Sequence, residues 1–75
     1  MTDVVLDAKG LNCPLPILKT KKSIKALETG QKIKVFSTDP GSVRDFDSFC
    51  QATGNVLIES KTESEGVFSF LIEKR

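Results

Sequence analysis

The sequence predicts an α/β fold, a two-layer sandwich in which two helices cover one face of a four-stranded mixed sheet. Three observations predict it: the length of 75 residues, two segments with apolar residues at helical spacing, and four short segments typical of strands. The predicted order is β-α-β-α-β-β, and two layers are the simplest way to bury both helices and one sheet face. Right-handed strand-helix-strand crossovers would make the sheet mixed. Residues 1–75 are therefore expected to form a single domain.

The first strand and helix are predicted from short local signals. The β-branched run at 4–6 indicates a strand that stops near Asp7. Proline is tolerated in the first helical turn, because the N–H that it lacks would have no partner there. The first helix is therefore predicted from 14 to about 28, with Cys13 as its N-cap and Pro14 as its first residue.

The remaining elements follow in order along the chain. Alternating apolar and charged residues predict a strand at 32–38. Asp39 is expected to cap a second helix, with Pro40 as its first residue. The last two strands are predicted at 56–62 and 67–73, joined by a turn. The predicted core positions of the helices and the last strand are Ile17, Thr20, Ile24, Leu27, Val43, Phe46, Phe49, Cys50, Thr53, Phe68, Phe70 and Ile72.

Composition places the chain among ordinary globular proteins, with 39% hydrophobic and 28% charged residues. No apolar run approaches the roughly 20 residues that span a bilayer, and the N-terminus lacks the pattern of a signal peptide. We therefore expect a cytoplasmic protein without a membrane partner. The net charge is +1, but residues 1–38 carry +4 and residues 39–75 carry −3. The basic half contains Cys13.

The chain has two cysteines, Cys13 and Cys50, no Cys-x-x-Cys pair and no histidine. Zinc, haem and iron–sulfur sites are therefore not expected, no cofactor is expected, and imidazole cannot act as a base. Free thiols are the default in a reducing compartment. Cys50 lies in the apolar stripe of the second helix and is interpreted as a core residue. A disulfide with Cys13 would require the two Cα atoms to lie close together.

Cys13 is the candidate nucleophile, because a helix N-terminus favours the thiolate. Pro16 at the third helical position has no N–H to donate, so the N–H of Leu15 is expected to be the main local donor to the sulfur. Asn12, Pro14, Leu15 and Pro16 are expected to shape the site, with electrostatic support from Lys9 and Lys19.

Such a thiolate attacks sulfur by direct displacement, without a general base or metal. A single exposed sulfur with no resolving cysteine beside it indicates a persulfide carrier. The alternative is a buried cysteine that packs as a small apolar side chain.

Two blocks of the sequence resemble the TusA/SirA family of small sulfur carriers. Residues 6–16 contain Cys13-Pro14-Leu15-Pro16, which is similar to the family's Cys-Pro-x-Pro hallmark, and residues 39–46, continuing to Phe49-Cys50, look like its second-helix signature. The resemblance runs from Leu6 to about Lys74. It implies the two-layer α/β fold and maps the persulfide-carrying cysteine onto Cys13. In the family, the second helix starts near the cysteine loop, so Asp39 and Arg44 could help to frame the site.

Family membership would also imply protein partners. The implied sulfur donor is a cysteine desulfurase or a rhodanese, and the implied acceptor is a DsrE-type or equivalent protein. The pathway stays open among tRNA thiolation, sulfur oxidation and sulfur supply for molybdenum enzymes. The chain would act as a sulfurtransferase-type protein co-substrate rather than as an independent enzyme. We expect a monomer that does not bind nucleic acid directly.

Two alternatives remain at this point. The first is an RNA-binding module, since Lys19, Lys22 and Lys25 form a basic stripe near Lys9. Net charge near zero, the absence of Tyr and Trp, and five phenylalanines interpreted as core residues argue against it. The second is a thiol redox regulator that uses Cys13, alone or together with Cys50. The lysine stripe could equally be a solvated helix face, or it could make the surface around the sulfur positive.

Overall fold

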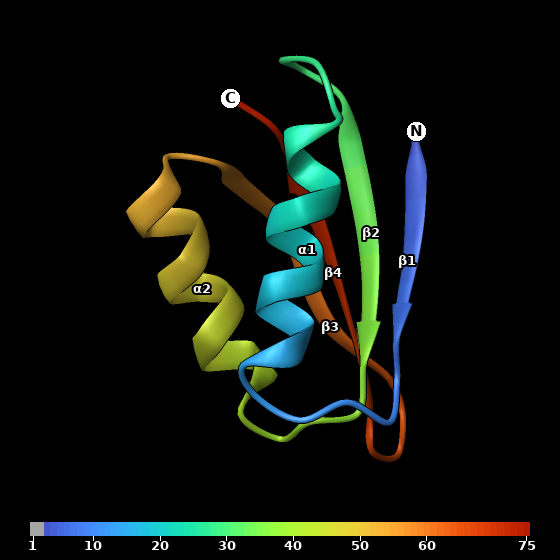
Figure 1. Cartoon of the computed structure of the whole chain (residues 1–75). Helices are drawn as coiled ribbons and strands as arrows, with labels where there is room; N and C mark the ends of the chain where they lie inside the picture. Colours follow the sequence, from blue (N-terminus) through green and yellow to red (C-terminus); the bar gives the residue numbers. More distant parts are fainter. Residues whose placement is uncertain (1–2) are drawn as a thin grey trace.

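The computed structural model describes residues 3–75, and its elements follow the predicted order (Figure 1). The strands are β1 (Val4–Ala8), β2 (Lys32–Ser37), β3 (Val56–Ser64) and β4 (Val67–Glu73), and the helices are α1 (Leu15–Lys25) and α2 (Ser42–Thr53). The sheet order is β1-β2-β4-β3, with β1 parallel to β2 and β4 antiparallel to both of its neighbours. The predicted four-stranded mixed sheet is therefore confirmed.

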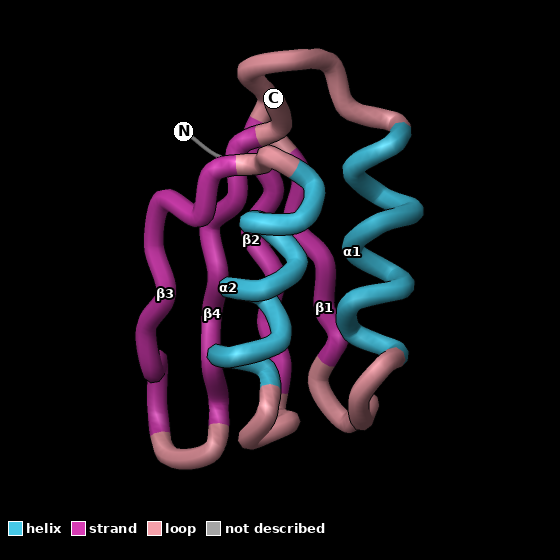
Figure 2. The backbone as a smooth tube through the Cα atoms, turned by 90° about the vertical axis from the view of Figure 1, so that its left-hand side faces the viewer, coloured by secondary structure: helices cyan, strands magenta, loops and turns pink. Residues whose placement is uncertain are grey.

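Both helices lie on the same face of the sheet (Figure 2). Alternation along β2 explains why, since Ile33 and Val35 are fully buried toward the helices while Lys34 and Phe36 point to the opposite face. No helix among residues 3–75 has the length and apolar character needed to cross a bilayer.

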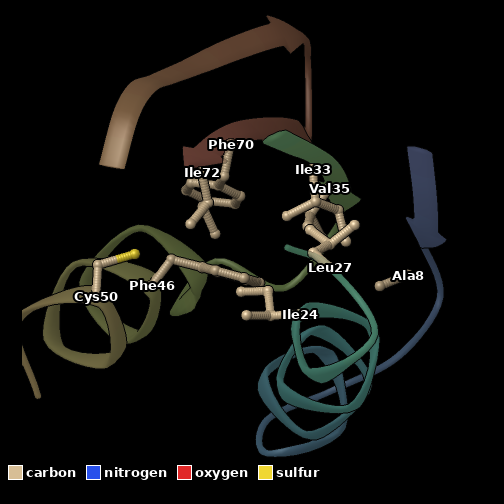
Figure 3. Close-up of a cluster of buried hydrophobic side chains, with 9 residues drawn as sticks. All are labelled: Ala8, Ile24, Leu27, Ile33, Val35, Phe46, Cys50, Phe70 and Ile72. Carbon is tan, nitrogen blue, oxygen red and sulfur yellow. The ribbon is translucent and has the colours of Figure 1, made fainter. Parts of the chain in front are cut away.

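The core fills the space between the sheet and the helices (Figure 3). Its centre is Phe46 of α2, which stacks on Phe70 of β4 with ring centroids 4.4 Å apart. The buried apolar residues are Ala8, Ile24, Leu27, Ile33, Val35, Phe46, Cys50, Phe70 and Ile72. Cys50 is 3% exposed, which confirms its predicted core position.

Some predicted core positions are wrong. Val43 is 47% exposed, because it lines an open groove beside β3 instead of facing the core. Thr53 is also exposed, and its hydroxyl donates to the carbonyl of Phe49. Phe36 is not in the core either. Its ring lies on the open face of the sheet, 5.5 Å from the Nζ of Lys34.

The predicted start of the first helix is one residue early. Pro14, with φ −97° and ψ 12°, is the N-cap of α1, and its carbonyl accepts the first helical hydrogen bond from Leu18 at 3.0 Å. The N–H of Leu15 donates to the carbonyl of Asn12 at 2.9 Å, so a turn precedes the helix. Cys13 therefore lies one residue before the cap. It is not the cap itself.

The helix also ends earlier than predicted. The N–H groups of Ala26 and Leu27 donate to carbonyls three residues back, at 3.2 and 3.0 Å. These tighter bonds close the last turn, so α1 ends at Lys25, although Leu27 is still buried.

The second helix begins at Ser42 instead of Pro40. Asp39 forms a turn before it: its Oδ1 accepts the N–H of Gly41 at 3.2 Å, and its carbonyl accepts the N–H of Ser42 at 3.0 Å. Gly41 becomes the N-cap, because its carbonyl accepts the helical bond from Asp45. The short polar side chain of Asp39 thus stabilises a turn at residues 39–42. Pro40 and Gly41, which the sequence pattern had assigned to the helix, therefore lie before its first residue.

The strand boundaries differ by smaller amounts. β1 continues to Ala8, one residue past the predicted end, and β2 ends at Ser37 instead of Thr38. β3 continues to Ser64, because Ser64 pairs with Val67 across a hairpin tighter than the predicted one.

Candidate functional site

The sulfur of Cys13 sits in the connection between β1 and α1. Its side chain is exposed, whereas Pro16 on the first turn of α1 is buried. The carbonyl of Pro16 accepts a hydrogen bond from the buried Thr20 hydroxyl at 2.8 Å. The first turn of α1 is therefore anchored in the protein on one side and presents the cysteine to solvent on the other.

Asp39 ties this connection to the loop after β2. Its Oδ2 accepts the backbone N–H of Cys13 at 3.0 Å, across 26 residues of sequence. A second link joins the same two loops, where the N–H of Gly10 donates to the Thr38 hydroxyl at 2.8 Å. Because β1 and β2 are parallel, both loops leave the same edge of the sheet, and these bonds hold them together.

Asp39 therefore frames the site, as the resemblance suggested. Arg44, which the resemblance also suggested for the site, instead lines the groove between α2 and β3.

A second carboxylate meets the sulfur from α2. The Cys13 sulfur and one oxygen from each of Asp39 and Asp45 lie within 4.8 Å of one another. Asp45 is not among the site residues predicted from the sequence. The helix predicted from Pro40 placed it in the second turn, whereas the observed start at Ser42 puts it in the first turn, where side chains tilt toward the N-terminus and hence toward the preceding loop.

The prediction that the surroundings of Cys13 favour its thiolate is wrong. Hydrogen bonding to the Asp45 carboxylate, desolvation, and the negative charges of Asp45 and Asp39 raise the pKa of the Cys13 thiol above its ordinary value. The N–H of Leu15, expected to donate to the sulfur, is instead bound to Asn12. The nearby carboxylates therefore disfavour the thiolate, which is opposite to the effect predicted from the helix N-terminus.

Neither Lys9 nor Lys19, which were predicted to support the site electrostatically, is among the groups that shift the pKa of the Cys13 thiol. Lys9 extends toward the open face of the sheet, where its Nζ lies 6.0 Å from the centroid of the Phe36 ring. For Lys19, the role remains a prediction from sequence.

The other cysteine has a contrasting environment. Cys50 is buried, and its burial, with a contribution from the charge of Asp47, raises the pKa of its thiol to about 11. Both thiols are free. Among the described residues, Cys13 is thus the accessible sulfur.

We assign no metal to Cys13, Asp39 and Asp45. The three groups lie close together, but Cys13 is exposed, both carboxylates are only half-buried, and acidic groups near the surface commonly cluster without an ion.

Apolar side chains are exposed on α1, and an open groove lies beside α2. Leu15 and Leu18 on α1 are 46% and 53% exposed. A groove of about 900 Å³ runs between α2 and β3, with Val43 and Leu57 in its wall, and it reaches the site through Asp45. Exposed apolar side chains on the helix that follows Cys13 are suited to contact with another protein.

The fold and site together define a class: a small α/β protein in which, among residues 3–75, one cysteine is exposed at the edge of the sheet and the other is buried. Comparisons with known proteins narrow the class. The family model described as sulfurtransferase TusA matches residues 4–74. A sulfur carrier protein TusA from Allochromatium vinosum is 60% identical over 72 residues, which cover 96% of this chain and 93% of that protein.

Two further matches agree. A sulfur carrier protein TusA from Pseudomonas putida (strain GB-1) is 40% identical over 73 residues, covering 97% of this chain and 90% of that protein. The crystal structure of a SirA-like protein from Desulfitobacterium hafniense has a TM-score of 0.82 and covers 93% of this chain and 95% of that one. At 24% identity the latter supports the fold alone. This chain belongs to the TusA family.

Proposed function

We propose that the protein is a sulfur carrier, which accepts sulfane sulfur as a persulfide on Cys13 and hands it to an acceptor protein. The observation that carries the proposal is the contrast between the cysteines, one exposed beside two prolines and one buried. Membership of the TusA family and relatives whose names describe sulfur carriers support it.

The transfer follows from thiol–disulfide chemistry. The Cys13 thiol loses its proton, and the resulting thiolate attacks the outer sulfur of a persulfide on the donor protein. A bond forms between the Cys13 sulfur and this outer sulfur, while the sulfur–sulfur bond of the donor breaks. The donor cysteine leaves as a thiolate and takes up a proton. Cys13 ends as a persulfide, and the same displacement in the opposite role delivers the sulfur to the acceptor.

The proposed function requires two protein partners, a sulfur donor and a sulfur acceptor. The donor is a cysteine desulfurase or a rhodanese, and the acceptor is a DsrE-type or equivalent protein. Leu15 and Leu18 provide apolar contact area on the helix that follows the sulfur. The proposal leaves the pathway open among tRNA thiolation, sulfur oxidation and molybdenum cofactor supply.

Persulfide loading tests the proposal. The protein is incubated with a cysteine desulfurase and cysteine, and separately with a rhodanese and thiosulfate, and its intact mass is measured. We expect the wild type to gain the mass of one sulfur atom with at least one donor, and Cys13→Ser to gain none. The matched control is Cys50→Ser, which should load like the wild type. Equal loading of Cys13→Ser, with loss of loading in Cys50→Ser, would show that the wrong cysteine has been assigned.

A further inference from the structure

Asp45 is a half-buried carboxylate that the transfer chemistry above does not use. It is fixed in the first turn of α2, where its backbone N–H donates to the carbonyl of Gly41 at 3.0 Å. Its side chain reaches to within 4.8 Å of the Cys13 sulfur. A carboxylate in this position acts directly on the reacting atom.

The charge of Asp45 has no counter-ion among residues 3–75. Every ion pair there involves Glu59, Glu63 or Glu73, all on the strands. Asp39, the other carboxylate at the sulfur, has no basic partner either and accepts backbone N–H groups. The sulfur therefore lies beside two negative charges that the described chain does not neutralise.

Unpaired carboxylates change the reactivity of a neighbouring thiol. An S–H group can donate a hydrogen bond to a carboxylate, whereas a thiolate is repelled by it. The charged groups that act on Cys13 come from two places, Asp39 in the loop after β2 and Asp45 on α2, and both favour the protonated form. Because only the thiolate attacks sulfur, this arrangement lowers the reactivity of Cys13 in the free protein.

We propose that Asp45 holds the Cys13 thiol in its protonated form in the free carrier, and that a basic side chain beside the donor's persulfide releases it. The inference rests on the proposed sulfur-carrier function. When the basic group pairs with Asp45, the thiol proton passes to solvent and the thiolate attacks the donor's outer sulfur. The bonds formed and broken are those of the transfer already described. Cys13 is thereby more reactive in the docked complex than in the free carrier.

The free protein provides the first test, through alkylation of Cys13 by iodoacetamide over a range of pH. The reagent is uncharged, and peptide-resolved mass spectrometry separates Cys13 from Cys50. Asp45→Asn keeps the shape and removes the charge. We expect its alkylation profile to move to lower pH and its rate at neutral pH to rise several-fold. Asp45→Ser should move the profile in the same direction, and circular dichroism checks that both variants fold.

Asp47→Asn is the matched control, because it removes the same charge from the same helix at an exposed residue that acts on Cys50. Its Cys13 profile should coincide with that of the wild type. A profile for Asp45→Asn that stays in place or moves to higher pH would overturn the proposal. So would an equal shift in Asp47→Asn, which would indicate a general field of the helix.

Sulfur loading tests the second half of the proposal. If the donor supplies a basic group to Asp45, the advantage of Asp45→Asn over the wild type should be smaller in loading by a cysteine desulfurase than in alkylation. An advantage of equal size in both reactions would contradict release by the partner. If no variant loads with any donor, the carrier function itself fails, while the alkylation profiles still decide the role of Asp45 in the free protein.

Discussion

At the scale of single residues, the two cysteines differ because one is surrounded by charge and the other by apolar side chains. Cys50 is 3% exposed and packs in the core with Phe46. Burial penalises its thiolate and raises the pKa of its thiol to about 11. Cys13 is exposed, and the Asp45 and Asp39 carboxylates raise the pKa of its thiol. The pKa of the same chemical group is therefore shifted in the same direction for two different physical reasons.

The buried thiol makes stability dependent on alkaline pH. In the unfolded chain Cys50 ionises near its ordinary pKa of 9.0, whereas in the folded protein it stays neutral to about 11. Its contribution to stability is complete below about pH 9 and is lost as the pH rises toward 11.

Urea unfolding at a series of alkaline pH values measures this loss. We expect the free energy of unfolding to fall more steeply between pH 9 and 11 in the wild type than in Cys50→Ala. Cys13 is present in both proteins, so its own titration cancels in the comparison. Parallel curves would show that Cys50 does not titrate with a raised pKa.

The exposure of both cysteines was predicted correctly from the sequence, whereas the effect of nearby charges on the Cys13 thiol was not. The Cys-Pro-x-Pro pattern and the apolar stripe of the second helix were enough to predict an exposed Cys13 and a buried Cys50. The effect of Asp39 and Asp45 could not be predicted, because it depends on how the Cys13 loop meets the loop of Asp39, 26 residues away in sequence, and the start of α2, which carries Asp45.

At the scale of elements, local hydrogen bonds decide where each helix begins. Proline and aspartate patterns identified both helices, but each starts later than predicted, because a turn forms first at Asn12–Leu15 and at Asp39–Ser42. Side-chain and backbone turns of this kind compete with the first helical turn, and a residue pattern alone does not show which will form.

The end of α2 is fixed by Gly54, which adopts φ +76° in the left-handed region. A side chain there is strained whatever space surrounds it, so Gly54→Ala should lower the free energy of unfolding by about 1 kcal/mol. Asn tolerates this conformation better, so Gly54→Asn should lose less. Chemical denaturation of both variants measures the difference, and equal losses would point to a cause other than backbone conformation.

At the scale of the whole molecule, a small core holds the two layers together while the opposite face of the sheet stays charged. Ion pairs such as Lys34 to Glu63, at 3.6 Å, lie on that open face. The four-stranded mixed sheet with two covering helices could be predicted because the order of the elements, the need to bury the apolar side of each helix, and the right-handed crossover rule together favour it. The expected monomer remains a prediction.

The core should depend strongly on Phe46, which is fully buried and stacked on Phe70. Phe46→Ala should cost about 3–5 kcal/mol, a large part of the stability of a domain this small. Phe36→Ala removes the same side chain from the open face and should cost clearly less. Thermal or urea unfolding compares the two variants, and similar costs would show that the helix-covered face is not the main core.

The most direct test of the sulfur-carrier function is to locate the carried sulfur. The wild-type protein is loaded by a sulfur donor, separated from it, and examined by peptide-resolved mass spectrometry before and after exposure to an acceptor protein. The proposed function predicts one additional sulfur on the peptide that contains Cys13, followed by its loss to the acceptor. Additional sulfur on the Cys50 peptide, or sulfur on Cys13 that no acceptor removes, would contradict it.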